Sequence, residues 1–136
     1  MKVYVLDANA VIRYLSKGIG EEKVAALIDR AAKGEARLLV SVINWGEALY
    51  TLARVTGLSQ AKADLKSLST YLEPVVADEA QVEAAAAVRL KYKLGYADCF
   101  AASLAIRERA TLVTADPDFA KLGQQLKVLA LPRHKA

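Results

Sequence analysis

Short apolar runs alternate with longer helical patterns along the whole chain, and this alternation most constrains the fold. Five runs have the length and composition of strands: VYVL at 3–6, RLLV at 37–40, PVV at 74–76, TLVT at 111–114 and KVLAL at 127–131. Strands separated by helices form βαβ units. The sequence therefore predicts an α/β fold, a three-layer sandwich in which helices flank a mainly parallel five-stranded sheet.

Capping residues and stop signals predict where the helices begin and end. Residues 20–34 place apolar side chains at helical spacing, and Gly34 is a stop signal. A helix also follows Asp7, over ANAVIRYL. The other predicted helices run from Val42 to about Thr56 with Ser41 as N-cap, from a Ser59 cap to about Tyr71, from Asp78 to about Lys93, and from Tyr96 to about Arg109.

Length and composition indicate one globular domain spanning residues 1–136. Hydrophobic residues make up 54% of the chain and charged residues 25%, and no Gly- or Pro-rich linker interrupts it. The single cysteine, Cys99, excludes an intramolecular disulfide and a cysteine-cluster zinc site. No run reaches transmembrane length and the first residues do not form a signal peptide, so we expect a cytoplasmic protein without membrane contact.

The formal net charge is +4, with a pI of about 9.2. Positive charge favours approach to a polyanion such as nucleic acid. The basic residues are scattered along the sequence and form no dense block. By itself the charge is therefore typical of an ordinary solubilising surface.

Two acidic residues come just after predicted strands. Asp7 directly follows the first strand, and Asp116 comes two residues after the fourth. In parallel sheets ligands bind beyond the carboxyl ends of the strands. Each acid also has a purely structural interpretation: Asp7 is a candidate helix N-cap, whereas Asp116 and Asp118 flank Pro117 in a turn sequence, with Asp118 as another possible cap.

Asp98 stands out because it lies in GYADCFAASLAI, residues 95–106, which is otherwise almost wholly apolar. A helix ending near Arg109 leaves one residue before the strand at 111, so it must run back from the carboxyl edge of the sheet. About 14 residues span about 21 Å, roughly the depth of a sheet. Its first turn, with Asp98, then lies at the carboxyl edge. A helix N-terminus favours a carboxylate by only about 0.3–1 kcal/mol, less than burial costs, so a further partner is expected.

Glu47 lies on the helix that follows the second predicted strand. Trp45, Leu49 and Leu52 form an apolar stripe there, and Asn44, Glu47, Thr51 and Arg54 form a polar one. A glutamate on a polar helix face is usually just solvated. Its position one to two turns from the same sheet edge makes it a fourth candidate for a site.

Four acids from four separate segments are thus expected near one edge, where their charges repel. A hard divalent cation such as Mg²⁺ or Mn²⁺, which prefers oxygen ligands, resolves that conflict. His134, the only histidine, lies in the tail and has no partners for a triad, and no Gly-rich phosphate loop is present. A carboxylate-held ion suits phosphoryl chemistry, and the net charge is compatible with a nucleic-acid phosphodiester as substrate.

Four segments together resemble the acidic motifs of PIN-domain nucleases, most closely the VapC-type toxins of toxin–antitoxin pairs. They are VYVLDANAVIRYL, SVINWGEALYTL, YADCFAASLAI and TLVTADPDF, and they follow the order of that family over nearly the whole chain. The resemblance implies that Asp7, Glu47, Asp98 and Asp116 are the metal-binding and catalytic acids. Asn9 and Thr114 match polar positions near the first and last of these acids, and Asp118 is a possible auxiliary ligand.

The resemblance implies an Mg²⁺- or Mn²⁺-dependent endoribonuclease that acts on RNA, forms a homodimer and is neutralised by a cognate antitoxin. Cys99 departs from the family pattern, in which alanine is commoner there, without touching the acids. One alternative is a non-catalytic RNA-binding or assembly module of the same fold. A haloacid-dehalogenase-like phosphotransferase is disfavoured because Asn9 stands where that class has a second Asp, and a receiver domain because only one acid follows the first strand.

Overall fold

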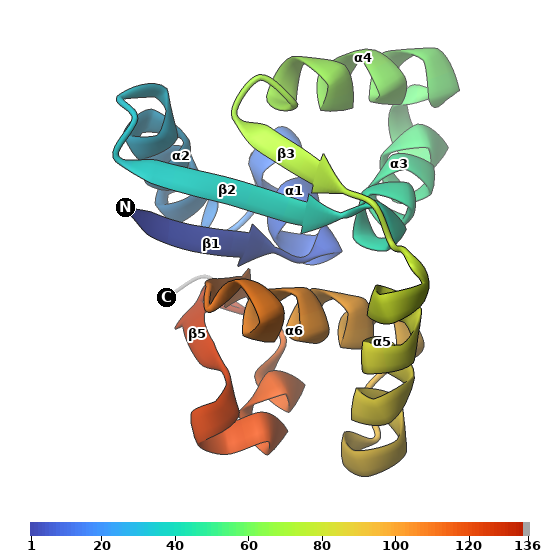
Figure 1. Ribbon diagram of the computed structural model, residues 1–136. Helices are drawn as coiled ribbons and strands as arrows, with labels where there is room; N and C mark the ends of the chain where they lie inside the picture. The colour runs from blue at the N-terminus through green and yellow to red at the C-terminus, as the bar shows by residue number, and fades with distance from the viewer. Residues whose placement is uncertain (135–136) are drawn as a thin grey trace.

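The computed structural model describes residues 1–134 and has a parallel five-stranded sheet at its centre (Figure 1). The strands are β1 (Lys2–Leu6), β2 (Ala36–Ser41), β3 (Leu72–Val75), β4 (Thr111–Thr114) and β5 (Lys127–Ala130). Their order across the sheet is β3-β2-β1-β4-β5, and every neighbouring pair is parallel. The expected α/β sheet is confirmed.

Helices cover both faces of the sheet. They are α1 (Ala8–Leu15), α2 (Glu21–Ala32), α3 (Val42–Thr56), α4 (Leu58–Leu68), α5 (Glu79–Tyr92), α6 (Tyr96–Glu108) and the 3₁₀ segment η1 (Pro117–Gln125). Helices α1 to α4 share one apolar core with the sheet, whereas α5, α6 and η1 share the other. The result is the predicted three-layer arrangement, and η1 forms where a short helix capped by Asp118 was one of the alternatives.

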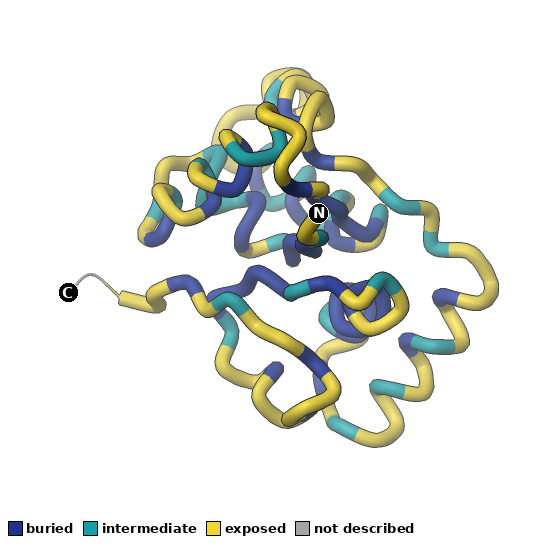
Figure 2. Tube along the Cα trace, turned by 60° about the vertical axis from the view of Figure 1, so that its left-hand side comes forward, coloured by how far each residue is buried: buried dark blue, intermediate teal, exposed yellow. Residues whose placement is uncertain are grey.

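Successive side chains along each strand point to opposite faces of the sheet, so each central strand contributes to both cores. Tyr4 and Leu6 of β1 face the core with α1 to α4, and Val5 between them faces α6. Helix α6 is buried from Cys99 to Ala105, as its apolar sequence predicts. Buried residues gather in the central strands β1, β2 and β4 and in α6, whereas the edge strands β3 and β5 are largely exposed; Figure 2 shows the burial along the chain.

The chain order creates a switch point between β1 and β4. From β1 the chain moves outward through β2 to β3, then crosses back to β4 on the other side of β1 and continues to β5. The crossovers that leave β1 and β4 therefore diverge. In sheets of this kind, a crevice opens at the carboxyl ends of the two strands where the order reverses.

The start of α4 differs from its prediction. Ser59 is not the N-cap: the helix begins at Leu58, and Gly57 is both the C-cap of α3 and the N-cap of α4, without a side-chain hydrogen bond. Gly57 has φ of +90°, a conformation that favours glycine, so the chain turns there before Ser59 is reached. Ser41 and Asp78 do cap α3 and α5, accepting from the backbone N–H groups of Ile43 and Gln81.

Strand β3 begins two residues earlier than its apolar run suggested. Leu72 is fully buried and pairs with Leu38, and α4 correspondingly ends at Leu68 rather than near Tyr71. Pro74 is tolerated because β3 is an edge strand. No helix in residues 1–134 is long and apolar enough to cross a membrane.

Candidate metal and phosphodiester site

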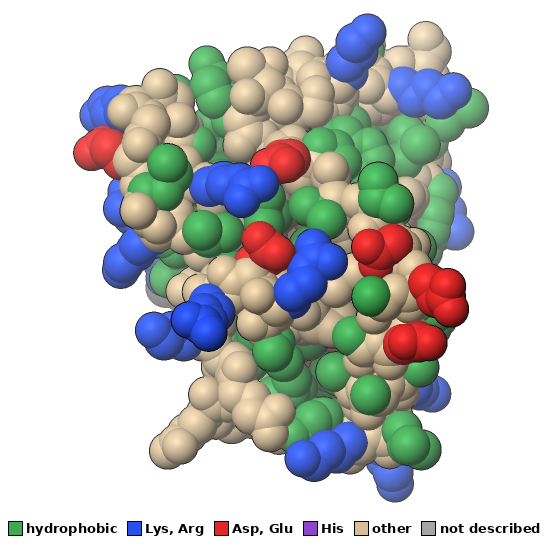
Figure 3. Space-filling model, viewed as in Figure 1, with side chains coloured by type: hydrophobic (Ala, Val, Ile, Leu, Met, Phe, Trp, Pro, Cys, Tyr) green, Lys and Arg blue, Asp and Glu red, His purple; other side chains and the backbone are tan. Residues whose placement is uncertain are grey.

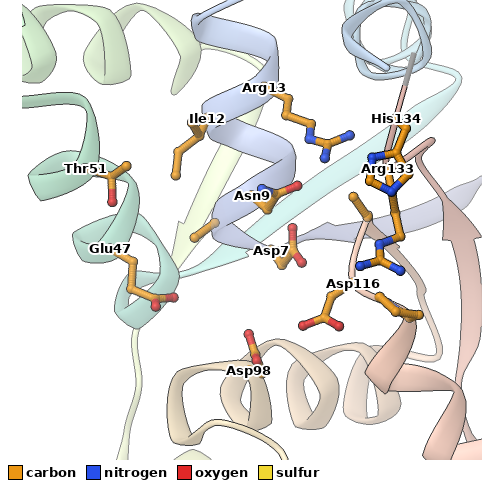
Figure 4. A pocket seen from close by; sticks show the side chains of 13 residues that line it. Asp7, Asn9, Ile12, Arg13, Glu47, Thr51, Asp98, Asp116, Arg133 and His134 are labelled. Atoms are coloured by element: carbon orange, nitrogen blue, oxygen red, sulfur yellow. The ribbon is translucent and has the colours of Figure 1, made fainter. Parts of the chain in front are cut away.

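A cleft of about 550 Å³ opens at the carboxyl ends of β1 and β4, at the switch point (Figure 4). Its walls come from the start of α1, the exposed side of α3, the first turn of α6, the loop after β4 and the C-terminal segment. The lining residues are Asp7, Ala8, Asn9, Ile12, Arg13, Glu47, Thr51, Asp98, Ala115, Asp116, Pro117, Arg133 and His134. All four acids singled out in the sequence therefore lie in one cleft.

Asp7 lies at the floor of the cleft, only 3% exposed. Its Oδ1 accepts a 2.8 Å hydrogen bond from the Ala10 N–H, so it is the N-cap of α1 as well as a cleft residue. Burial raises its pKa from 3.8 to about 6; its two hydrogen bonds lower the pKa, and the charges of Asp98 and Asp116 add to the rise. The two interpretations of Asp7 thus apply together.

Thr114 connects Asp7 to the loop after β4. Its hydroxyl donates to Asp7 Oδ2 and accepts a 3.0 Å hydrogen bond from the Asp116 backbone N–H. The β1–β4 pairing aligns Leu6 with Val113, so the residues that follow these two are neighbours. Thr114 is buried and does not line the cleft, so it orients Asp7 from behind.

Asp98 projects into the cleft from the first turn of α6, as the length argument predicted. Its pKa is raised from 3.8 to about 6, first by partial burial and then by the negative charges of Asp116, Glu47 and Asp118. Charges from two other segments, α3 and the loop after β4, thus act on one carboxyl group. That mutual repulsion is what a bound cation would relieve.

Glu47 faces the cleft from α3, but the polar stripe on which it was placed is only partly solvated. Asn44, one turn earlier, is completely buried and donates from Nδ2 to Glu47 Oε1 at 3.0 Å. The apolar side of α3 is centred on the buried Ala48 and Leu52, with Trp45 and Leu49 only partly buried. Helical spacing alone could not show that α6 covers Asn44.

The loop after β4 holds the last acid. Asp116 caps η1 by accepting a 2.9 Å hydrogen bond from the Asp118 N–H, so Asp116 rather than Asp118 is the cap. Asp118 is exposed and does not line the cleft, although its charge acts on Asp98. Asn9 is exposed at the cleft mouth.

Three basic residues of the cleft were not predicted from the sequence. Arg13 of α1 donates from Nη1 to the carbonyl oxygens of Ile19 and Pro132, which holds the C-terminal segment against the cleft. Arg133 and His134 therefore line the cleft although they follow the last strand. In Figure 4 the Arg133 guanidinium points towards Asp116. No local sequence pattern indicates that the segment after β5 lies against the cleft at the end of β1.

The donor set suits a hard divalent ion, since it consists of carboxylates with an amide and hydroxyls nearby. Among residues 1–134, however, no three Asp, Glu, His or Cys side chains lie close enough together to hold one ion as they stand. An ion bound by one or two carboxylates would keep several of its waters, which is the usual behaviour of Mg²⁺. The residues of the cleft therefore fit a divalent ion that keeps several water ligands.

The sequence matches the model of the PIN domain family over residues 4–125. The chain belongs to the PIN domain family. This assignment favours the nuclease interpretation over the phosphotransferase and the receiver domain. The search of curated protein sequences gave no match.

Solved structures with the same fold include components of toxin–antitoxin complexes. VapBC2 from Rickettsia felis, bound to a DNA fragment from its promoter, aligns with a TM-score of 0.76 at 22% identity over 95% of this chain and 98% of that one. DNA-bound VapBC from Salmonella typhimurium aligns at 0.74 and 17% identity, over 96% and 98%. VapC20 from Mycobacterium tuberculosis, a toxin that cleaves the sarcin–ricin loop, aligns at 0.68 and 17% identity, over 88% and 95%.

Proposed function

We propose that this protein is a divalent-metal-dependent endoribonuclease and the toxin of a toxin–antitoxin pair, acting in the cytoplasm. One observation carries the proposal: carboxylates from four separate segments line one cleft at the switch point of a PIN domain. Within residues 1–134 no ion pair joins these acids to a basic side chain, and unpaired like charges in one place destabilise a protein that has no bound cation. A cation bound in the cleft would offset this repulsion.

Asp7, Glu47, Asp98 and Asp116 would bind Mg²⁺ or Mn²⁺, directly or through its waters. When bound, such an ion binds phosphate oxygens, lowers the pKa of a bound water and stabilises charge on the leaving oxygen. The protein itself orients the carboxylates that would bind the ion. Thr114 holds the Asp7 carboxylate in place by hydrogen bonding to Oδ2, and the buried α6 holds Asp98 at the cleft.

Arg133 supports RNA as the substrate. A strongly acidic cleft repels a polyanion, so a phosphodiester needs a cation beside the acids. Arg13 is occupied by two backbone carbonyls, whereas no hydrogen bond or ion pair holds the Arg133 guanidinium within the described residues. Arg133 is therefore the side chain best placed to bind a substrate phosphate. On the face seen in Figure 3, basic side chains are interspersed with acidic and apolar ones, so no broad basic patch offers an alternative there.

The toxin role and the antitoxin partner rest on the solved toxin–antitoxin complexes that share this fold. We propose that a cognate antitoxin binds and inhibits the protein, and that the protein itself is a homodimer. Co-expression with the reading frame next to its gene should yield a co-purifying inhibitor, and light scattering of the isolated protein should give twice the chain mass. A lone monomer with no such inhibitor would indicate a free-standing RNA-processing nuclease.

Metal-dependent cleavage is tested with purified protein and a mixture of structured and unstructured RNAs. Cleavage should require Mg²⁺ or Mn²⁺, stop with EDTA, and fall by at least about a hundredfold in Asp98→Asn, which keeps the shape of the side chain but removes its charge. Cleavage that persists in EDTA would contradict the metal mechanism. RNA binding without turnover under all these conditions would instead support the non-catalytic RNA-binding module.

A further inference from the structure

Asn44 lies at the contact between the two helices that carry Glu47 and Asp98. Its side chain has no exposed surface. The two Nδ2 hydrogens serve two acceptors: Glu47 Oε1 at 3.0 Å, on the same helix, and the main-chain oxygen of Ala97 at 3.0 Å, on α6. Ala97 directly precedes Asp98, so a single amide group contacts both acid-bearing segments.

The chemistry of the two partners determines the orientation of this amide. A carboxylate oxygen and a carbonyl oxygen are both acceptors, so only the NH₂ end of the amide can face them. The other end, Oδ1, is then buried, and it has no hydrogen-bond partner within residues 1–134. A buried, unpaired acceptor destabilises a fold, and an apolar side chain of similar size would not carry this penalty. Stability alone therefore does not account for an asparagine at this position.

The bond to Glu47 is of the charge-assisted kind, which is stronger and more directional than a bond between neutral groups. It engages Oε1, and Oε2 keeps no protein partner among the described residues. The carboxylate is thus held by one oxygen while the other remains available at the cleft, which Glu47 lines. The bond to Ala97 ties the same group to the start of α6.

We propose that Asn44 is a positioning residue that fixes the Glu47 carboxylate relative to the first turn of α6, so that Glu47 and Asp98 keep their spacing before a metal ion binds. This inference rests on the proposed metal-dependent function. Asn44 does not line the cleft, so it acts through Glu47. Hydrogen bonds that hold a metal ligand are typically worth 10–100-fold in metal affinity.

The test compares Asn44→Leu and Asn44→Ala, which remove the same donor but pack differently. Both substitutions eliminate the orphaned acceptor, but leucine fills the site whereas alanine leaves a cavity. Mn²⁺ binding is measured by titration calorimetry, and stability by urea unfolding in EDTA. Both variants should bind Mn²⁺ about tenfold more weakly than the parent, although only Asn44→Ala should lose stability. Leu52→Ala, at a buried α3 position outside the cleft, should lose stability and keep parental Mn²⁺ affinity.

Two results would overturn the inference: parental Mn²⁺ affinity in Asn44→Leu, or weakening of Mn²⁺ binding that follows stability across all three variants. Either leaves the metal-dependent function intact. A parent protein that binds neither Mn²⁺ nor Mg²⁺ contradicts the proposed function itself, and the role of Asn44 falls with it. Asn44→Leu keeps the comparison usable if the cavity left by alanine prevents folding.

Discussion

At the scale of single residues, Asp7 combines a structural role with a place in the cleft. It caps α1 through Ala10 and accepts from the Thr114 hydroxyl, yet its pKa is raised to about 6 because burial outweighs both hydrogen bonds. The pKa of a capping carboxylate on the surface would be lowered instead, because no burial would outweigh its hydrogen bonds. The site therefore holds a carboxyl group whose ionisation the apo fold opposes.

Asp7→Asn should make the metal-free protein less sensitive to pH. Folded Asp7 keeps its proton up to about pH 6 and the unfolded residue only to 3.8, so the folded state binds more protons between these values. The free energy of unfolding of the parent in EDTA should then fall as pH rises through this window, by up to about 3 kcal/mol for this group, and level off above it. Asparagine retains an acceptor for the cap.

Urea unfolding of both proteins from pH 4 to 8 measures this effect. The decline with pH should be smaller in the variant, which should be the more stable protein at pH 7 to 8. Part of the decline should remain, because Asp98 also has its pKa raised to about 6. Identical pH profiles for parent and variant would show that burial of Asp7 does not govern its ionisation.

Arg133 gives a second prediction at this scale. In an Asp98→Asn background that does not cleave, Arg133→Ala should weaken RNA binding and reduce the slope of log K against log salt by about 1, as expected for one lost phosphate contact. Arg107→Ala is the matched control, because Arg107 lies near the far end of α6 and outside the cleft. Equal salt slopes for the two variants would remove Arg133 from the substrate site.

At the scale of secondary-structure elements, α6 depends on small side chains. Ala101, Ala102 and Ala105 are completely buried, which lets the helix backbone approach the sheet closely while its first turn carries Asp98 to the cleft. The apolar run is thus a packing surface, and its single carboxylate lies where the helix reaches the carboxyl edge.

Ala102→Leu should destabilise the protein by about 1–3 kcal/mol, because added methyl groups have no space in a packed core. Ala86→Leu, at an exposed position of α5, should change the free energy of unfolding by less than about 0.5 kcal/mol. Denaturant unfolding measures both. A tolerated leucine at 102 would mean that α6 packs less tightly than its complete burial indicates.

At the scale of the whole molecule, the cleft exists because the sheet order reverses between β1 and β4. The four acids lie far apart in sequence, so their repulsion is present only in the folded chain. A ligand that binds only the folded state stabilises it by mass action, by about 2.7 kcal/mol at a hundred times its dissociation constant.

Mn²⁺ or Mg²⁺ should therefore raise the melting temperature of the parent, increasingly with ion concentration. Asp98→Asn should show a smaller rise, since one acid of the cleft is lost. Asp29→Asn, at an exposed position of α2 outside the cleft, should respond like the parent. A response of Asp98→Asn equal to that of the parent would return Asp98 to a purely structural role.

Much of the fold could be read from local patterns. Run length and side-chain spacing report strands and helices because each depends on neighbours a few residues away, and parallel βαβ units then place Asp7 and Asp98 at one edge. The first and last residues of helices and strands were less predictable. Gly57 rather than Ser59 is the N-cap of α4, and β3 starts at Leu72, because a turn conformation and burial against β2 decide these positions.

By itself, the sequence determined the α/β class, the parallel sheet and the edge at which the acids lie, since these follow from periodicity and chain order. The tertiary structure alone decided that Asn44 is buried between α3 and α6, and that Arg133 returns to the cleft. Both depend on contacts between segments distant in sequence, through α6 covering one helix and Arg13 holding the tail. No local spacing encodes such contacts, because they arise only when the layers pack.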